Sequence, residues 1–465
     1  MKHSAAWRAP CYPSGTVNAA SSRAERIFEA PIVPTILRFA APGIVLVVFQ
    51  SSVSISDTHF VGRLGTEPLA GLALVFPLLM LLQMMSAGAM GGGVSSAIAR
   101  ALGGGHGHMA RALVVHATVI ALAMGAAFTL LLLAGGPAMY ALLGGRGAVL
   151  DAALAYSNII FAGSALVWLG NTFASALRGS GNMLVPALSF SGAALVHIPL
   201  SAALTLGLGP FPQLGIAGAA VAYLTASCCA AALNLAWLMR PGSSLRPRRG
   251  DFRLEARLFH EILRVGLVSM ASAFQTVLTA VLLTGFVGRF GTAALAGYGV
   301  GVRLELLQIP LVFAIGQAMV ALVGTHIGAG HTARAKKIAV TGSLMAASVC
   351  LVIGIAVAVA PRIWVELFSS DPDVLSASAS YLRIAGPFYA FLGLGIALYF
   401  ASQGAGRVLM PMLAGTVRLV LVIAGGLALI TTGAPLVAFF ALVAAGMAIY
   451  GALIGWWVLR SDWSR

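Results

Sequence analysis

The sequence predicts an all-α membrane protein with twelve transmembrane helices in two six-helix lobes, which are related by a pseudo-two-fold axis along the membrane normal. Three observations predict this fold. First, 59% of the 465 residues are hydrophobic, only 9% are charged and the mean hydropathy is +0.96, whereas a typical soluble domain has about 25% charged residues. Second, the apolar residues gather in twelve runs. Third, segments of the first half recur in the second.

Each predicted span is an apolar run of about 20 residues, which is the length that crosses the hydrocarbon core of a bilayer. The links between runs are short and rich in Gly and Pro, as in residues 207–215 and 431–435. We therefore expect neighbouring helices to pack antiparallel. The twelve runs begin near residues 37, 68, 113, 150, 184, 214, 262, 294, 338, 375, 410 and 436.

The order of the runs divides the chain into four parts. Residues 1–34 are polar and have no apolar segment like that of a signal peptide, so we expect a flexible cytosolic tail. Residues 35–239 form an N-lobe of six spans, and residues 262–465 form a C-lobe of six spans. Residues 240–261 form a basic cytoplasmic connector, which we expect to face solvent and lipid headgroups.

The chain has a net charge of +15, and the distribution of its basic residues indicates its orientation in the membrane. The basic residues gather in the N-terminal tail, in the connector and in alternate links, while the opposite side has only Arg63, Arg146, Arg289 and Arg362. Because cytoplasmic loops carry the excess of Lys and Arg, both termini are expected in the cytoplasm. The sequence thus predicts a multi-pass protein of the bacterial inner membrane, and no nucleic-acid partner.

The two halves are an internal duplication. FVGRLGTEPLAGLAL at residues 60–74 recurs at residues 286–300 as FVGRFGTAALAGYGV, with nine of fifteen positions identical. Because each half has an even number of spans, both halves enter the membrane from the same side. In transporters of this design the substrate binds between the halves near the midplane, and rocking exposes it to alternate sides. Two further pairs are GHGHMARA from Gly105 with GAGHTARA from Gly328, and ALRGSGNMLVPAL from Ala176 with ASQGAGRVLMPML from Ala401.

Four segments resemble the multidrug and toxic compound extrusion (MATE) family of exporters: SDTHFVGRLGTEPLAGLAL from Ser56, LRGSGNMLVP from Leu177, LGIAGAAVAYLTAS from Leu214 and YGVGVRLELLQIPLVFAIGQAMVALVGTHIGAG from Tyr298. The last is similar to the eighth helix of the DinF-like branch. The resemblance implies twelve helices in two lobes, a central cleft, and antiport of drug-like, often cationic compounds against protons or sodium. It also implies that Asp57 takes part in ion coupling.

The sequence departs from the family pattern on the fifth span. In parts of the family this helix carries an Asn and an Asp four residues apart, and the positions that correspond here are His197 and Ser201. The second acid of that site is therefore absent.

Asp57 and Glu305 are the acidic residues that lie clearly within apolar spans, and we interpret both as ion-coupling residues. A charged side chain at the centre of a span costs about 2.5 to 3.5 kcal/mol on insertion scales, so such residues usually have a function. Asp57 aligns with Leu283 and Glu305 with Leu79, so each acid belongs to one half only. The alternatives are a snorkelling acid for Asp57 and a buried ion pair for Glu305.

Polar residues on the spans are candidates for substrate binding. Competing interpretations stay open: amides that bond neighbouring helices, a core histidine, and an arginine that snorkels to the interface. One hypothesis is that Arg303 bridges to Asp57 across the cleft and holds one conformation closed. The candidates are Gln50, Asn171, His197, Gln275 and Arg303.

The sequence thus predicts secondary active multidrug efflux by alternating access, with no cofactor other than the coupling ion, H⁺ or Na⁺. The partners expected are small-molecule substrates and membrane lipids, and the protein is expected to be a monomer. The alternative is a flippase for a lipid-linked oligosaccharide or another lipid. An enzyme is not expected, because the chain shows no metal motif, nucleophile elbow or phosphate-binding loop.

Overall fold

The computed structural model of the protein describes residues 29–463. Within them, eleven helical segments are long and apolar enough to cross a membrane, and a pair of helices bent by 51° makes a twelfth span. The twelve predicted spans are thus confirmed. Most of the predicted tail lies outside the described residues. The uninterrupted spans are α2 (Ile32–Gly62), α5 (Gly107–Leu142), α8 (Leu184–Leu206), α9 (Ile216–Met239), α10 (Ala256–Gly288), α11 (Thr292–Gly328), α12 (Thr332–Val359), α16 (Leu409–Thr431) and α17 (Leu436–Arg460).

Three spans are built from more than one element. The second span has a π-helical segment in its middle, and the fourth is the bent pair. These spans are α3 (Thr66–Gln83) with η1 (Met84–Met90) and α4 (Gly91–Gly103), α6 (Gly147–Ala162) with α7 (Ser164–Gly179), and α14 (Pro372–Ala385) with η3 (Gly386–Phe388) and α15 (Tyr389–Gly404). Between residues 29 and 463, two short helices lie outside the spans: η2 (Arg249–Phe252) and α13 (Pro361–Val365).

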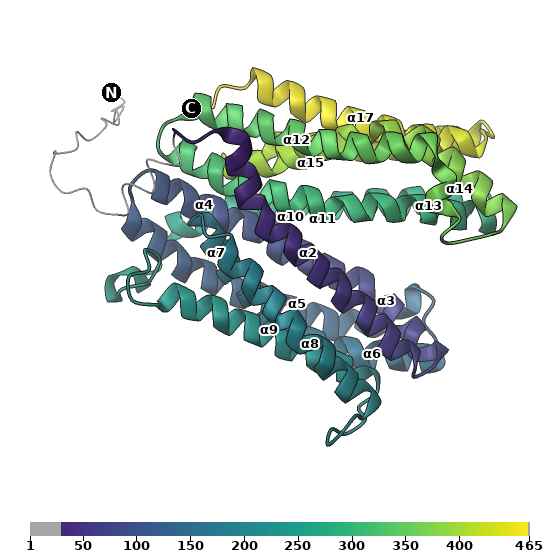
Figure 1. Cartoon of the computed structure of the whole chain (residues 1–465), viewed down its shortest axis with the longest axis horizontal. Helices are drawn as coiled ribbons and strands as arrows, with labels where there is room; N and C mark the ends of the chain where they lie inside the picture. The colour runs from purple at the N-terminus through teal and green to yellow at the C-terminus, as the bar shows by residue number, and fades with distance from the viewer. Residues whose placement is uncertain (1–28, 464–465) are drawn as a thin grey trace.

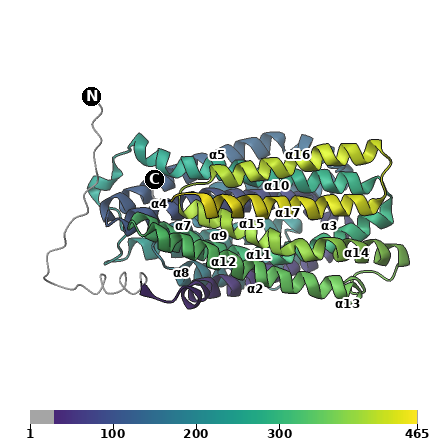
Figure 2. The same ribbon diagram turned by 90° about the horizontal axis from the view of Figure 1, so that it is seen from above.

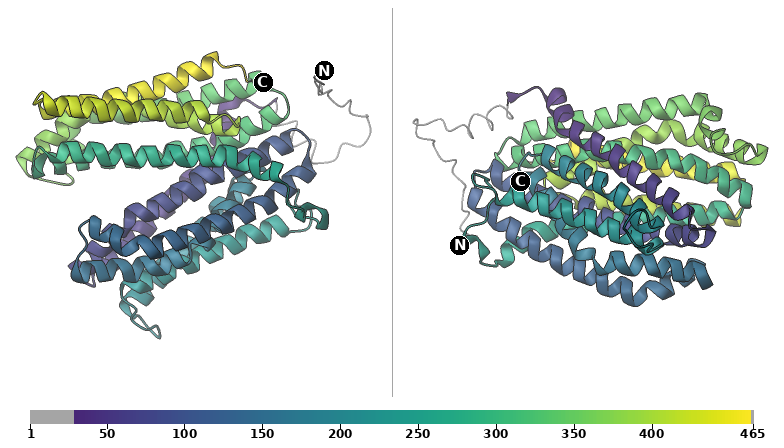
Figure 3. Two further views of the ribbon diagram at one scale, coloured as in Figure 1. Left: turned by 180° about the vertical axis from the view of Figure 1, so that it is seen from behind. Right: turned by 60° about the horizontal axis from the view of Figure 1, so that its bottom comes forward.

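The helices form two lobes, with α2–α9 in one and α10–α17 in the other (Figure 1). Seen from above, the helices of both lobes run along one common axis (Figure 2). The lobes meet at the end of the bundle where α2 begins and α17 ends, and they diverge toward the opposite end (Figure 3). We call these the joined end and the diverging end.

Each lobe has its own hydrophobic core, and the first helix of each lobe begins in the core of the other. Ile36 and Ala40 of α2 pack in the core of the C-lobe. Leu258 and Ile262 of α10 pack in the core of the N-lobe. Ile36 and Ile262 are related by the offset of the repeat, which also takes Phe60 to Phe286 (262 − 36 = 286 − 60 = 226). The two crossing helices therefore obey the same pseudo-symmetry as the sequence.

The turns correct one part of the predicted repeat register. Gly105 (φ 75°) and Gly330 (φ 79°) occupy equivalent left-handed turns. The sequence comparison paired Gly105 with Gly328, which is wrong by two residues. The error has a simple cause, since the local pattern of Gly, His, Ala and Arg matches at either register, whereas a turn with positive φ favours glycine strongly.

The π-helical segment η1 explains a change in offset along the second span. Thr66 and Thr292, which begin the equivalent helices, differ by 226 (292 − 66 = 226), whereas the turn glycines Gly105 and Gly330 differ by 225 (330 − 105 = 225). The N-lobe thus has one extra residue in this span. A π-helix has i to i+5 hydrogen bonds and so absorbs a one-residue insertion without ending the helix. Such segments often occur at functional sites.

Candidate functional site

Asp57 lies in a buried polar contact between α2 and α8. Its side-chain atom Oδ1 is 2.9 Å from Nε2 of His197 and accepts a hydrogen bond of 2.7 Å from Oγ of Ser201. Asp57 is only 7% exposed and His197 only 1%. Because His197 and Ser201 are four residues apart on one helix, both side chains face the same neighbour. A buried carboxylate needs such partners, and the structure places them where the fifth-span pattern departs from the family.

The imidazole of His197 has one bonded and one unbonded nitrogen. Nε2 contacts Asp57, while Nδ1 is buried and has no hydrogen-bond partner among residues 29–463. The ring of Tyr223 stands edge-on to the imidazole at a centroid distance of 6.3 Å. The pair is an ion pair when His197 is protonated and a neutral hydrogen bond when Asp57 holds the proton. It can therefore hold a proton at either of two groups.

A second polar network lies beside this pair and includes Asn171. The amide of Gln83 donates a hydrogen bond of 2.6 Å to the hydroxyl of Tyr223. The amide of Asn171 donates to Gln83 at 3.0 Å and to Ser86 at 2.8 Å. Gln83 lies next to the π-helical segment η1, and Ser86 lies within it. The network links α7 to the second span, and through Tyr223 it reaches the ring of His197.

Glu305 forms a separate site in the C-lobe. The hydroxyl of Tyr381 donates a hydrogen bond to its carboxylate, and Arg418 of α16 interacts with it electrostatically. The guanidinium of Arg418 lies 5.8 Å from the centroid of the Tyr450 ring. Sequence reasoning missed Tyr381, because a tyrosine on an apolar span looks like ordinary core packing.

Among the described residues, the hydrogen bonds of Asp57 and Glu305 do not involve the remaining candidates. Gln50 is exposed on α2. Gln275 donates a hydrogen bond of 2.8 Å to Thr416 and so joins α10 to α16. Arg303 is exposed, and its guanidinium lies 5.3 Å from the centroid of the Phe368 ring within its own lobe.

The hypothetical bridge from Arg303 to Asp57 is absent in this conformation. Asp57 is bonded to His197 and Ser201 instead. Arg303 lies instead over the ring of Phe368 in its own lobe. The partners bonded to Asp57 are an imidazole and a hydroxyl, and among the described residues no group of three His, Cys, Asp or Glu side chains could hold a metal ion.

Comparison with known families places both lobes in one family. The family model described as MatE matches residues 42–203 and 268–428. The starts of the two matched segments differ by the offset of the internal repeat (268 − 42 = 226). The match thus covers most of each lobe.

Individual relatives match over most of their length. The FAD transporter of Shewanella oneidensis is 26% identical over 399 residues, which are 85% of this chain and 87% of that protein. A probable multidrug resistance protein NorM of Thermotoga maritima is 25% identical over 379 residues, 81% of each chain.

Solved structures share the fold. One is described as the outward-facing conformation of a multidrug resistance MATE family transporter; it matches with a TM-score of 0.86 and 22% identity over 93% of this chain and 96% of that one. A MOP superfamily transporter from Pyrococcus furiosus matches with a TM-score of 0.85 and 21% identity over 93% and 96% of the two chains.

Proposed function

This chain belongs to the MATE family of membrane transporters, and we propose that it exports small organic molecules in exchange for protons that bind at Asp57. Members of this family are transporters rather than enzymes. The observation that carries the proposal is the contact of one buried carboxylate with an imidazole and a hydroxyl. A buried ionisable group in a span usually serves the transport pathway.

The proton is the coupling ion that this site favours. A metal cation such as Na⁺ is bound best by several oxygen atoms, whereas one of the two bonded partners of Asp57 is the nitrogen of His197. Histidine is the side chain whose charge changes between pH 5 and 8. A proton that enters the pair changes its net charge, which a bound substrate can sense.

The orientation of the chain assigns the two ends of the bundle. With the basic links in the cytoplasm, the joined end is cytoplasmic and the diverging end faces outward. The conformation then corresponds to the outward-facing state, in which a substrate leaves and a proton arrives. The solved relative described as outward-facing, with its TM-score of 0.86, supports this assignment.

Helix α2 provides a physical route from the proton site to the contact between lobes. It packs Ile36 in the core of the C-lobe and carries Asp57 in the N-lobe. Pro42 lies inside this helix, where it removes one backbone hydrogen bond and makes bending easier. Protonation of Asp57 changes its bonds to α8, and α2 transmits that change to the other lobe.

The names of two relatives support a proposal for the substrate class. The NorM relative is named for multidrug resistance and the Shewanella relative for FAD, so we propose amphipathic organic molecules, including cations. Where the exchange moves one net charge, as for one proton against a neutral molecule, 100 mV is worth about 2.3 kcal/mol, which corresponds to a concentration ratio of about fifty. The exchange of one proton for one monovalent cation is driven by the pH difference alone.

The test is uptake into proteoliposomes under a proton gradient or a sodium gradient, each imposed alone. Ethidium and FAD serve as the cationic and the anionic probe. We expect the proton gradient alone to drive uptake of at least one probe, and Asp57→Asn to reduce that uptake to the level of empty liposomes. Uptake driven only by sodium, or full activity in Asp57→Asn, would contradict the proposal.

A further inference from the structure

The backbones of the two lobes come into direct contact where α4 crosses α11 at the joined end. A Cβ atom added at Gly103 would overlap the carbonyl oxygen of Thr325, and one added at Gly328 would overlap that of Arg100. The residues correspond at an offset of 225 (325 − 100 = 225 and 328 − 103 = 225). The crossing is therefore the same on both sides of the pseudo-two-fold axis, and glycine is what allows it.

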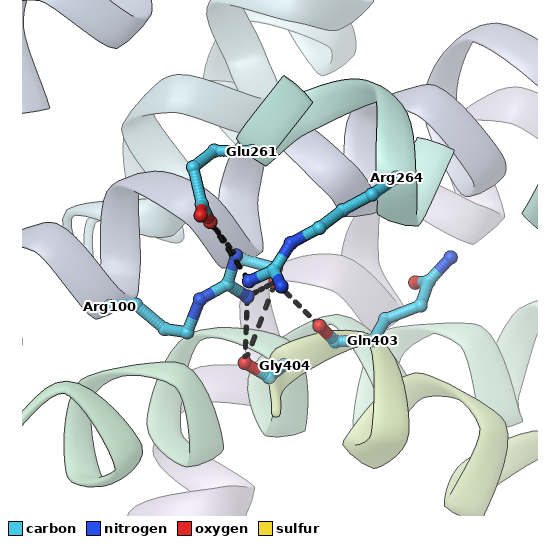
Figure 4. Close-up of polar contacts among 6 residues, drawn as sticks. Arg100, Glu261, Arg264, Gln403 and Gly404 are labelled. Carbon is cyan, nitrogen blue, oxygen red and sulfur yellow. Dashed lines mark hydrogen bonds and ion pairs between the residues drawn. The ribbon is translucent and has the colours of Figure 1, made fainter. Parts of the chain in front are cut away.

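An ion cluster sits on this crossing and joins the lobes. Nη2 of Arg100 on α4 is 3.3 Å from Oε2 of Glu261 at the start of α10. Nη1 of Arg100 is 3.4 Å from the carbonyl oxygen of Gly404 on α15 and also donates to Ser96. Figure 4 shows Arg100 lying between Glu261 and Gly404. One side chain of the N-lobe thus contacts two helices of the C-lobe.

The cluster is asymmetric although the crossing beneath it is symmetric. Arg100 corresponds to Thr325 at the offset of 225, and Glu261 corresponds to Thr35 at the offset of 226 (261 − 35 = 226). The equivalent positions in the other half therefore carry two threonines in place of the ion pair, and the charged contact there is a different one, from Arg334 of α12 to the backbone carbonyl of Ala30. The close approach of the two backbones recurs with threonines at these positions, so the packing of the crossing itself does not require the Arg100–Glu261 pair.

The pair can separate without leaving an acid unpaired. Glu261 is also bonded to Arg264, which lies three residues further along α10, at 2.9 Å. The side chain of Arg264 is 42% exposed, while those of Arg100 and Glu261 are only 13% and 24% exposed. When the lobes part, Glu261 keeps Arg264 and Arg100 reaches water. The arrangement avoids the large cost of an isolated buried charge.

We propose that Arg100 and Glu261 form a latch that holds the joined end closed, and that their separation is part of the step that opens this end. The latch is a positioning device that acts on the lobes, and it rests on the proposed alternating access. It stabilises the outward-facing state until the binding of a proton or a substrate shifts the equilibrium toward the other conformation. Each contact of Arg100 with Glu261 or Gly404 must break before α4 moves away from α10 and α15.

The test measures the distance between spin labels at the diverging end. Leu208→Cys and Thr432→Cys place exposed labels on the two lobes, in a chain from which Cys11, Cys228, Cys229 and Cys350 have been replaced. We expect Glu261→Gln and Arg100→Gln each to raise the population with the shorter label distance at least threefold. The matched control is Arg264→Gln, which leaves the contact between lobes in place and removes the partner that Glu261 keeps when the lobes part, so it should not raise that population.

A variant with both substitutions tests whether Arg100 and Glu261 act as one pair or independently. If the pair acts as one unit, Arg100→Gln with Glu261→Gln shifts the populations no further than Arg100→Gln alone. An unchanged distribution in Glu261→Gln, additive shifts in the double variant, or an equal shift in Arg264→Gln would overturn the latch. The distances need no transport, so a failure of proton coupling in the liposome assay leaves this test intact.

Discussion

The N-lobe and the C-lobe share one fold but differ at the positions of their buried acids. In the N-lobe, Asp57 is bonded to His197 and Ser201. Its counterpart in the C-lobe, Leu283, is 3% exposed and packs in the apolar core. The same helix position thus accepts either a bonded carboxylate or a leucine, so the fold does not need the acid. The difference teaches that the buried Asp57 site was built on one copy of a duplicated scaffold.

The largest expected effect is that of the acid in the N-lobe. Asp57→Asn keeps the size of the side chain and removes its charge, so we expect proton-driven uptake to fall about a hundredfold. Purification yield and melting temperature, measured beside uptake, check that the fold is kept. Normal transport by Asp57→Asn would show that the acid of the N-lobe is not needed, and the proposed difference between the lobes would then be wrong.

The next effect is that of the imidazole beside Asp57. His197→Asn retains a hydrogen-bond donor on the buried face but cannot titrate between pH 5 and 8. We expect the transport rate to fall about tenfold and its dependence on external pH between 5.5 and 8 to flatten. Ser201→Ala, which removes the other partner, serves as the control and should keep the pH dependence. A pH dependence that persists in His197→Asn and flattens in Ser201→Ala would show that a group other than His197 takes up the proton.

A smaller effect is expected in the C-lobe. Glu305→Gln keeps one acceptor for the hydroxyl of Tyr381, so we expect the apparent affinity for cationic probes to weaken by a few fold while proton coupling persists. The measurement is the KM for ethidium uptake under a fixed pH gradient. Loss of coupling equal to that of Asp57→Asn would show that both lobes carry protons.

The smallest effect is expected where the basic connector docks on the N-lobe. Asp251 is 2.9 Å from Arg111 of α5, and the backbone N–H of Glu255 donates to His116. Burial alone raises the pKa of Asp251, but hydrogen bonds from Arg248 and Arg111 and their charges lower it more, so the net pKa lies below its ordinary value.

Because the pKa of Asp251 is lower in the folded state, its contribution to stability is present above the ordinary pKa and is lost as pH falls through the lowered value. Asp251→Asn should therefore leave transport at pH 7 unchanged. It should speed hydrogen exchange of the Glu255 amide at pH 7, and the difference from wild type should shrink as the pH falls below the ordinary pKa of Asp251 and through the lowered one. A loss of transport in Asp251→Asn would contradict this prediction and would show that the connector takes part in transport.

The sequence was sufficient to predict the spans, the two lobes and the burial of an acid at Asp57, because hydropathy and the repeat are local signals. It also identified His197 and Ser201 as the residues at the altered positions. It could not show that they bond to Asp57, since that contact depends on how α2 packs against α8. The pairing of Arg100 with Glu261 was missed for the same reason, as both residues lie near links that look solvated.

The measurement that tests the central claim most directly is proton release on substrate binding. Purified protein in weakly buffered detergent is mixed with ethidium, and a pH-indicator dye follows the proton. We predict about one proton released per bound ethidium in the wild type, release that is retained in Glu305→Gln, and none in Asp57→Asn, which still binds the dye. Equal release from Asp57→Asn would contradict the assignment of the proton to the N-lobe.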